Sequence, residues 1–328
     1  MFPSVSIPHD QSGLIQSEFL FESAPFPSCH ASTLAESQGQ LVAAYFGGSA
    51  EGNPDVGIWV SRRENEKWLA PLEVADGVQS PALRYPCWNP VLFQPATGPL
   101  LLFYKVGPSP QTWWGMLTKS SDGGKSWSVA ERLPAPFVGP IKNKPLQLEN
   151  GEILYPSSSE DSGWRVHFEK TDAAVENWEA TPALNDAEKI RAIQPSLLSF
   201  GGGRLQAVGR TREGRLFSIA SPDAGKTWGQ MTLLNLPNPD SGTDALTLRD
   251  GRQLVIYNHS STARTPLNLA LSLDGKAWTP VLTLENAPGE FSYPALIQTE
   301  DGLVHCTSTW NRQRIRHAVI DPARLSVS

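Results

Sequence analysis

One short motif recurs along this chain at nearly constant spacing. It has the form S-x-D-x-G-x-T-W and occupies residues 221–228, with a second copy at 120–127 and a copy one residue shorter at 272–278. We expect each copy to form a tight turn, because the aspartate can cap neighbouring backbone N–H groups and glycine accepts a positive φ. The tryptophan that ends each copy can pack the turn onto a sheet.

Degenerate copies of the motif end at two further tryptophans, so five residues mark the repeat: Trp68, Trp127, Trp178, Trp228 and Trp278. The spacings between them are 59, 51, 50 and 50 residues. A constant period of this size predicts a repeat architecture. Between the turns lie short apolar runs separated by many of the 27 glycines and 28 prolines, which is typical of strands and turns.

Each period holds the same order of strands, and the innermost strand of the six units is expected to start at 30, 89, 144, 194, 244 and 293. Six such units predict an all-β, six-bladed β-propeller formed by residues 1–328 as one domain. The sixth unit ends without a turn motif of its own. We therefore expect a strand from residues 1–24 to complete the last blade and close the ring.

Composition excludes several classes of protein. The net charge of −6 argues against nucleic acid or an anionic membrane as the main partner. No apolar run reaches the roughly 18–20 residues of a membrane span. The first residues lack the pattern of a signal peptide, and Cys29, Cys87 and Cys306 are too few for a disulfide framework, so we expect a reduced, cytoplasmic protein. No sequence motif calls for a cofactor.

The six inner strands begin with polar residues that are all different: His30, Asn89, Lys144, Gln194, Asp244 and Tyr293. Inner strands of a propeller start together at one end of the channel, so these side chains are predicted to form one ring. A structural role would be expected to repeat one residue type. We interpret the ring as the functional site, the alternative being polar strand starts that only line a wet channel.

Further charged residues fall at strand ends near the ring: Asp55, Lys105, Lys142, Glu160, Arg191, Arg210, Arg212, Arg264 and Arg312. A basic channel mouth in an acidic protein favours an anionic small ligand, and arginine suits a carboxylate because it bonds both oxygens. Nearby tryptophans either stack on sugar rings or pack between blades, and the sequence leaves both open: Trp88, Trp113, Trp114, Trp164 and Trp310.

The turn motifs and the six units resemble the sialidase superfamily of exo-glycosidases, often called BNR-repeat or Asp-box neuraminidases. The resemblance implies an arginine triad that holds a carboxylate, a tyrosine nucleophile activated by a glutamate, and an aspartic acid/base. Tyr293, in Phe-Ser-Tyr-Pro, resembles the nucleophile. Arg210 and Arg264 resemble two triad arginines, and Asp55 falls about where the acid/base would lie.

The chain departs from the family pattern in two places, which suggests a divergent subgroup. The stretch 26–30, Phe-Pro-Ser-Cys-His, has no counterpart of the first-blade arginine. The activating glutamate is also missing, and Arg191 occupies about its place. We expect Asp244 to replace it as the acceptor of the proton of Tyr293.

Three functions follow from these residues. The first is a sialidase-like hydrolase of an acidic sugar or oligosaccharide, with Tyr293, Asp244 and Asp55 catalytic. The second is a lyase on uronate with His30 or Tyr293 as base. The third is a sugar-binding propeller without activity. The expected substrate contacts are Arg210, Arg264, Arg191, Lys144, Lys142, Asn89, Gln194 and Trp88. No His or Cys spacing indicates a metal, although a Cys/His site near His30 stays open.

Overall fold

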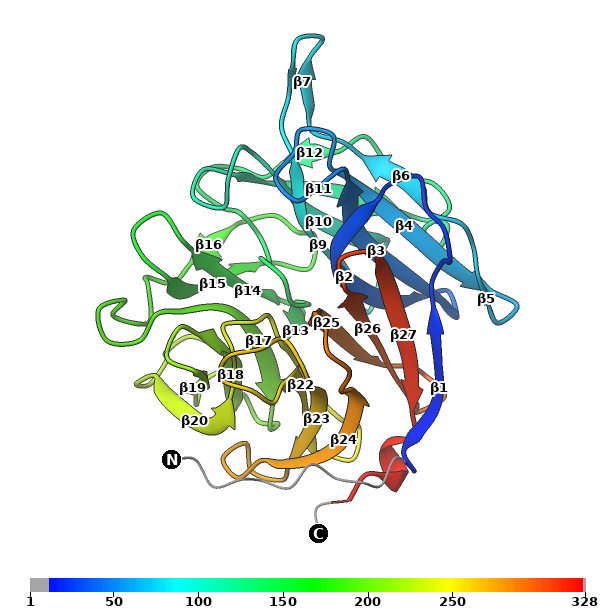
Figure 1. Cartoon of the computed structure of the whole chain (residues 1–328). Helices are drawn as coiled ribbons and strands as arrows, with labels where there is room; N and C mark the ends of the chain where they lie inside the picture. The colour runs from blue at the N-terminus through cyan, green and yellow to red at the C-terminus, as the bar shows by residue number, and fades with distance from the viewer. Residues whose placement is uncertain (1–11, 327–328) are drawn as a thin grey trace.

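The computed structural model describes residues 12–326 and shows six sheets arranged around a central axis (Figure 1). Each sheet runs from an inner strand at the axis to an outer strand at the rim, with neighbouring strands antiparallel. The predicted six-bladed β-propeller is confirmed.

Blades 1 to 3 follow one another along the chain. Blade 1 contains β2 (Ser28–Ser37), β3 (Gln40–Gly48), β4 (Gly57–Glu64), β5 (Lys67–Trp68) and β6 (Leu72–Ala75). Blade 2 contains β9 (Cys87–Phe93), β10 (Leu100–Val106), β11 (Trp114–Ser120) and β12 (Glu131–Arg132). Blade 3 contains β13 (Leu146–Gln147), β14 (Ile153–Ser159), β15 (Arg165–Thr171) and β16 (Glu179–Ala180).

Blades 4 to 6 complete the circle. Blade 4 contains β17 (Ala192–Ser199), β18 (Leu205–Thr211), β19 (Arg215–Ser221) and β20 (Thr232–Pro237). Blade 5 contains β21 (Asp244–Thr247), β22 (Gln253–Asn258), β23 (Leu267–Ser272) and β24 (Thr279–Glu285). Blade 6 contains β25 (Phe291–Gln298), β26 (Val304–Trp310), β27 (Arg314–Ile320) and β1 (Leu14–Phe19).

The ring closes between the two ends of the described chain. Strand β1 pairs antiparallel with β27, from Leu14 opposite Ile320 to Phe19 opposite Arg316. Blade 6 thus takes three strands from the C-terminal end and its outer strand from the N-terminal end (Figure 1). The prediction that an N-terminal strand completes the last blade is confirmed.

The apolar core lies between the blades. The second strands are almost entirely buried on both faces, and every residue of β10 is buried. Sheets covered on both faces carry continuous apolar runs, and the sequence of β10, Leu-Leu-Leu-Phe-Tyr-Lys-Val, fits this apart from one lysine.

The recurring motif forms the turn between the third and the outer strand, and it packs onto the preceding blade. In blade 4, Asp223 accepts hydrogen bonds from the backbone N–H and the hydroxyl of Thr227, at 2.8 and 2.7 Å. Gly225 has a φ of +83° and lies against Leu154 of blade 3. Trp228 stacks on Phe168 of blade 3 with ring centroids 4.1 Å apart. The turn therefore fastens one blade to the next.

Two small elements lie outside the blades. Strands β7 (Val78–Ser80) and β8 (Leu83–Arg84) form a hairpin that projects from the ring (Figure 1). The 3₁₀ turn η1 (Pro322–Arg324) follows the last strand. In the part of the chain that the structure describes, no helix is long and apolar enough to cross a membrane.

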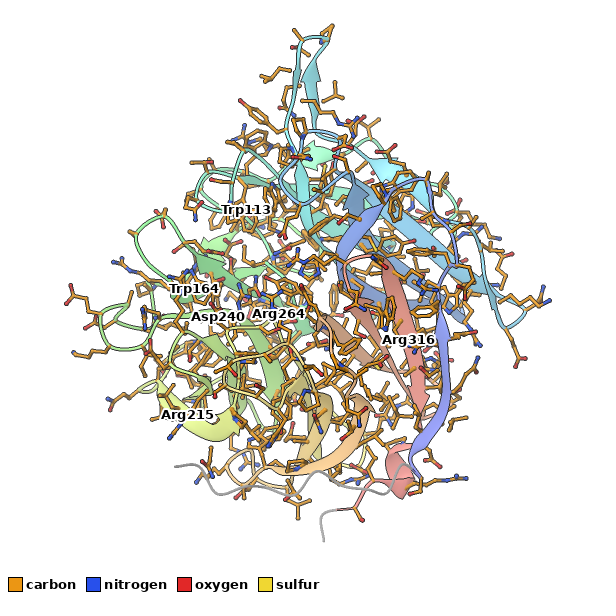
Figure 2. All side chains as sticks on the ribbon, in the orientation of Figure 1. Trp113, Trp164, Arg215, Asp240, Arg264 and Arg316 are labelled. Atoms are coloured by element: carbon orange, nitrogen blue, oxygen red, sulfur yellow. The ribbon has the colours of Figure 1, made fainter. Side chains whose placement is uncertain are left out.

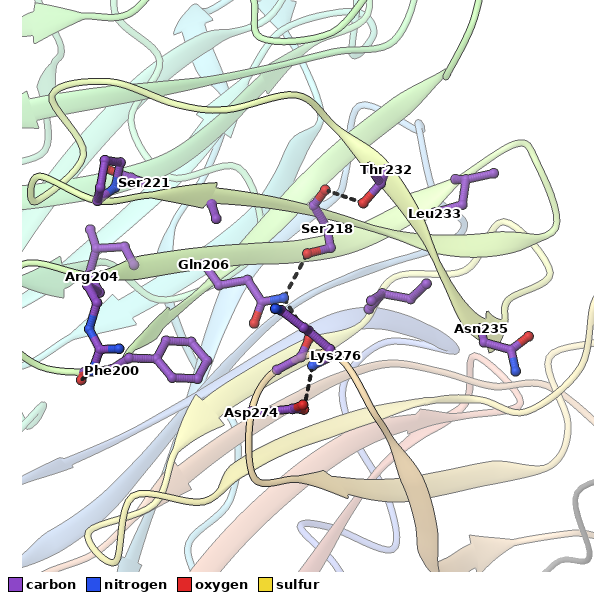
Figure 3. Close-up of a pocket in the computed structure, with 15 residues that line it drawn as sticks. Phe200, Arg204, Gln206, Ser218, Ser221, Thr232, Leu233, Asn235, Asp274 and Lys276 are labelled. Carbon is purple, nitrogen blue, oxygen red and sulfur yellow. Dashed lines mark hydrogen bonds between the residues drawn. The ribbon is translucent and has the colours of Figure 1, made fainter.

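A cavity of about 740 Å³ lies between blades 4 and 5 on the side of the turn motifs (Figure 3). Gln206 crosses it and donates hydrogen bonds to Ser218 Oγ and to the carbonyl of Gly275, at 2.7 and 2.8 Å. Phe200 and Leu233 form part of its apolar wall. None of the predicted ring residues lines this cavity.

The contact between blades 4 and 5 yields a stability prediction. In Gly275→Ala the new methyl group would lie 2.1 Å from Gln206 Oε1 and 2.8 Å from Phe200 Cζ, at a φ of +73°. The matched control is Gly251→Ala in the same blade, with a φ of +89° and no atom within 4 Å of the methyl position. The control should lose about 1–2 kcal/mol of unfolding free energy from the backbone alone.

Gly275→Ala should lose roughly 1–3 kcal/mol more than the control, because overlap forces the hydrogen-bonded Gln206 to move. Urea denaturation of both variants measures the difference. Equal losses would contradict this account of how the two blades are joined.

Candidate functional site

The inner strands of blades 2, 4 and 6 carry a β-bulge at one end. Two residues there face one residue of the second strand, as the register shifts show. Asn89, Gln194 and Tyr293 occupy these bulges with φ angles of +38°, +56° and +48°. Each precedes a proline, which cannot donate to the strand ladder and is therefore compatible with a bulge. The sequence thus places three ring residues in equivalent, unusual backbone positions.

The predicted equivalence of the ring residues is wrong in blade 1. The bulge residue there is Ala31, with a φ of +55°. His30 pairs with Phe46 just before the bulge, as Trp88 pairs with Lys105 in blade 2. His30 therefore lies one position earlier than its predicted place, because no proline marks the bulge in this blade.

The equivalence is also wrong in blades 3 and 5, whose inner strands show no bulge. In blade 5, Asp244 pairs with Ile256. The corresponding pair in blade 4 is Ser196 with Val208, and Ser196 lies two residues after the bulge residue. Asp244 is therefore equivalent to Ser196 and not to Gln194. Lys144 precedes the short strand β13 and bonds Asp244. Pro145 follows Lys144 without forming a bulge. The same X-Pro pattern therefore occurs at two different positions relative to the second strand of the blade.

Tyr293 is the centre of the side chains that do meet. Its ring centroid lies 4.2 Å from that of His30, and its hydroxyl lies 3.5 Å from Gln194 Nε2. A methyl group at Gly242 would lie 3.1 Å from Tyr293 Cδ2, so the backbone of Gly242 packs closely beside the ring. Four blades therefore converge on one phenol.

Three cationic side chains surround the same ring. The guanidinium carbons of Arg210 and Arg264 lie 5.4 and 5.8 Å from the ring centroid of Tyr293, and Lys142 Nζ lies 5.9 Å from it. Figure 2 shows Arg264 near the centre of the propeller. We call these three cations, together with His30, Gln194 and Tyr293, the axial site.

Lys142 is fully buried in this site. Its ammonium donates to Asn143 Oδ1 and to the carbonyl of Thr243, both at 2.9 Å, and to the carbonyl of Pro294. Burial lowers the pKa of Lys142 to about 7, and the charges of Lys144 and Arg210 act in the same direction. The backbone acceptors supply partners, but no carboxylate touches this ammonium in the described chain.

Glu290 links two arginines of this region, Arg264 and Arg312. It accepts hydrogen bonds from Arg264 at 2.8 Å, Arg312 at 3.1 Å and the hydroxyl of Ser292 at 2.9 Å. Burial by itself would raise the pKa of Glu290, but the hydrogen bond and charge of Arg312 lower it overall. Glu290 thus stays ionised and holds two arginines in place.

His30 is an uncharged member of the site. Its Nδ1 lies 2.9 Å from the hydroxyl of Thr309, and the side chain is fully buried. Burial lowers the pKa of His30 well below its ordinary value, and Arg312, Arg264, Arg210 and Lys142 lower it further. The imidazole is therefore neutral, and the cations beside it make it a weaker proton acceptor than an ordinary histidine.

The structure does not bring Asp244 to the hydroxyl of Tyr293. Its oxygens accept hydrogen bonds from Lys144 Nζ at 2.8 Å, Ser196 Oγ at 3.0 Å and the backbone N–H of Leu296 at 2.7 Å. With these donors it ties blades 3, 4 and 6 together. No hydrogen bond joins Asp244 to the Tyr293 hydroxyl among the described residues, so the geometry gives no support to its expected role as proton acceptor.

Two other predicted site residues lie in exposed loops. Asp55 accepts hydrogen bonds from the backbone and hydroxyl of Ser49, both at 2.8 Å. Arg191 pairs with Glu213 at 2.9 Å and is about half exposed. Neither has a described contact with Tyr293. The residue that meets the hydroxyl is Gln194, an amide where the resemblance implies a carboxylate.

Of the remaining residues predicted to contact a substrate, one has an unused side chain and the tryptophans already have partners. Asn89 is buried, and its side chain makes no hydrogen bond with another described residue, so it can serve a ligand. Trp88 donates to the carbonyl of Gly107 at 2.8 Å and packs between blades. Trp164 lies under Arg210 and Arg212, with distances of 4.8 and 4.2 Å from ring centroid to guanidinium carbon.

Sequence reasoning missed two carboxylates, Glu290 and Asp240. Both precede an inner strand closely, at three residues before Tyr293 and four before Asp244. This position in the sequence could have identified both carboxylates. Residues just before an inner strand lie at the same end of the channel as the predicted ring residues.

No group of three or more His, Cys, Asp or Glu within residues 12–326 is arranged to hold a metal ion. The three cysteines are buried thiols. Burial raises the pKa of Cys29 and of Cys306 to about 12 and raises that of Cys87 as well. Such thiols are packing groups rather than thiolate ligands.

Comparison with known proteins bears on the fold. Residues 39–306 match the sequence profile described as the BNR repeat-like domain. No match is found among curated proteins. Among solved structures, a protein of unknown function from Dyadobacter fermentans shares 17% identity with a TM-score of 0.78, covering 94% of this chain and 98% of that one.

Two further solved structures are enzymes by name. An intramolecular trans-sialidase from Ruminococcus gnavus, in complex with oseltamivir carboxylate, shares 12% identity with a TM-score of 0.77, over 97% of this chain and all of that one. An α-L-arabinanase from Penicillium chrysogenum, complexed with arabinobiose, shares 19% identity with a TM-score of 0.67, over 95% and 99%. These likenesses establish a shared fold, and the match of residues 39–306 to the BNR repeat-like domain confirms the predicted resemblance to BNR-repeat proteins.

The burial of Lys142 predicts a pH dependence of stability. Its folded pKa of about 7 lies below the ordinary 10.5. Between these values the unfolded chain binds the additional proton, so the free energy of unfolding should rise with pH by up to about 1.4 kcal/mol per unit. Lys142→Met should remove that contribution between pH 7 and 9.

Urea denaturation of wild type and variant across this pH range measures the slope. Lys125→Met removes an exposed lysine and should leave the slope unchanged. A Lys142→Met slope equal to that of wild type would contradict the account of a strongly desolvated ammonium at the axis.

Proposed function

Because the chain belongs to the BNR repeat-like domain family, we propose that it is a glycoside hydrolase that acts on a carboxylate-bearing sugar at the axial site. The observation that carries the proposal is the set of three cations around the ring of Tyr293, in a protein whose net charge is −6. A local excess of positive charge in an acidic protein favours an anionic ligand. The names of the trans-sialidase and arabinanase relatives support a sugar.

The state of the polar groups supports a ligand in the axial site. Arg210 is 6% exposed and its Nε has no hydrogen-bond partner, and Gln194 is 2% exposed with an unpartnered Oε1. Leaving buried polar groups unpaired costs about 1–3 kcal/mol each. A carboxylate would give Arg210 an acceptor, and a sugar hydroxyl would give Gln194 a donor. A sugar acid therefore matches both.

Hydrolysis would use Tyr293 as the nucleophile. A neutral phenol suits an anomeric carbon beside a carboxylate, because an anionic nucleophile would be repelled there. The oxygen of Tyr293 would bond to the anomeric carbon as the bond to the leaving oxygen breaks, and water would then release the sugar. Gln194 would hold the hydroxyl without accepting its proton. His30, packed on the same ring, would accept the proton once the carboxylate of the bound sugar offsets the cations that lower the pKa of His30.

One observation favours a second candidate, elimination on a uronate. Gln194, an amide, lies beside the hydroxyl where a nucleophilic tyrosine would be served by a carboxylate. In elimination a base removes the proton next to the sugar carboxylate, a carbon–carbon double bond forms, and the bond to the leaving oxygen breaks. His30 or Tyr293 would be that base, and the arginines would stabilise the enolate.

Tyr293→Phe tests both chemistries. The variant should lose at least about a hundredfold in kcat on an acidic glycoside, because the phenolic oxygen is the nucleophile in hydrolysis and the base in an elimination that Tyr293 starts. Binding of the same sugar should persist, since the cations remain. Tyr85→Phe is the matched control, because Tyr85 packs on Trp114 away from the axial site.

Turnover of sialosides and of uronate oligomers measures the effect, and the product distinguishes the candidates. A new reducing end without ultraviolet absorbance indicates hydrolysis, whereas absorbance of a conjugated double bond indicates elimination. Full activity of Tyr293→Phe would rule out both roles. Binding without turnover of any acidic glycoside by the wild type would point to a sugar-binding propeller.

A further inference from the structure

The loop between β20 and β21 presents one carboxyl group to the axial site. Asn238 is fully buried, and its side chain donates to the carbonyl of Ser241 at 3.1 Å and accepts from the N–H of Ser241 at 2.9 Å. These bonds close a tight turn with Asp240 inside it, at a φ of +59°. Figure 2 shows Asp240 near the centre of the propeller, in the same region as Arg264.

The same loop contacts the phenol directly. Gly242 lies so close to the axial site that a methyl group there would be 3.1 Å from Tyr293 Cδ2 and 3.0 Å from Lys142 Cε. Asp240 is two residues away from this contact. The buried Asn238 turn therefore fixes the distance between the carboxyl group and Tyr293 through a short, constrained stretch of backbone.

Asp240 stands among arginines without being hydrogen-bonded to them. Its Oδ1 lies 3.8 Å from Arg210 Nε and its Oδ2 lies 3.9 Å from Arg212 Nε, both beyond hydrogen-bond range. Arg210 donates instead to the backbone carbonyl of Asp240, at 3.4 Å. Asp240 Oδ1 is buried and has no hydrogen-bond partner among the described residues. This oxygen is thus ion-paired with Arg210 but not hydrogen-bonded, so its hydrogen-bonding capacity is unused.

Burial raises the pKa of Asp240 above its ordinary value, although the charges of Arg210, Arg212, Arg264 and Arg191 lower it. Desolvation outweighs four arginines because the group is half-buried and receives no hydrogen bond from them. Asp240 therefore keeps its proton to a higher pH than an ordinary aspartate. Retention of a proton in a charged site is what a general acid requires.

The other carboxyl groups near the axis are committed elsewhere. Glu290 is ionised in its bonds to Arg264 and Arg312. Glu160 also has a raised pKa from burial, but its Oε2 accepts the indole N–H of Trp164 at 3.0 Å. The charges that act on Glu160 are those of Arg210 and Arg212, whereas Arg264, which lies beside Tyr293, also acts on Asp240.

We propose that Asp240 is the general acid of the axial site, which protonates the leaving oxygen as the glycosidic bond breaks. The inference rests on the proposed function and holds for hydrolysis and elimination alike. The proton passes from the carboxyl group to the bridging oxygen, which keeps the bonding electrons and departs as a neutral hydroxyl. In hydrolysis, the water that releases the sugar returns a proton to the carboxylate.

The test uses pairs of acidic substrates that differ only in the leaving group, which is methanol in one member and nitrophenol in the other. Glucuronosides and sialosides probe hydrolysis, and 4-O-substituted uronates probe elimination. Nitrophenolate departs without protonation, whereas methanol needs it. Asp240→Asn should lose about 10²–10⁴-fold in kcat/KM on the methyl member and little on the nitrophenyl member. The high-pH fall in the rate on the methyl substrate should also disappear.

Asparagine accepts a positive φ as readily as aspartate, so Asp240→Asn should fold, which its melting curve checks. Glu160→Gln is the matched control and should not change the ratio between the two leaving groups. The assignment would be overturned if Asp240→Asn lost kcat/KM equally on both substrates or lost none on the methyl substrate. It would also be overturned if Glu160→Gln lost kcat/KM on the methyl substrate alone. A wild type that cleaves no member of the panel would overturn the proposed function and this role together.

Discussion

The structure depends on the pairing of β1 with β27, which joins residues near the two ends of the chain. Each blade is an apolar sheet that is stable only between two others, so an open ring would expose the faces of its first and last blades. The pairing from Leu14–Ile320 to Phe19–Arg316 removes that opening. The axial site inherits its geometry from this closure, because Tyr293 of blade 6 meets His30 of blade 1 and Gln194 of blade 4.

A second constraint is the burial of positive charge at the axis. Lys142 is satisfied by backbone carbonyls and an amide, and Arg264 and Arg312 share Glu290, so the cations are held by fixed groups rather than by solvent. Such an arrangement favours an anion that binds beside Tyr293, because the positive groups are already desolvated and oriented. Burial at the axis also shifts the pKa values of nearby groups. The pKa of His30 is lowered and the pKa of Asp240 is raised relative to their ordinary values.

The fold was predictable because its signal is repetitive. Five tryptophans at a constant period marked the blades, and the missing sixth turn pointed to closure by an N-terminal strand. The axial site was predictable only in part. Gln194 and Tyr293 were found from an X-Pro pattern, but the same pattern at Lys144 belongs to another register, since a proline permits a bulge without requiring one. The partners of Asp244 and Glu290 could not be predicted, because pairing across blades leaves no periodic trace in the sequence.

The most direct test of the account is a crystal structure of the protein soaked with an acidic sugar that it binds. The account predicts the sugar carboxylate within hydrogen-bond distance of the guanidinium groups of Arg210 or Arg264, with the sugar ring against the hydroxyl of Tyr293. A sugar bound instead in the cavity between blades 4 and 5, with the arginines still engaged only by Asp240 and Glu290, would contradict it.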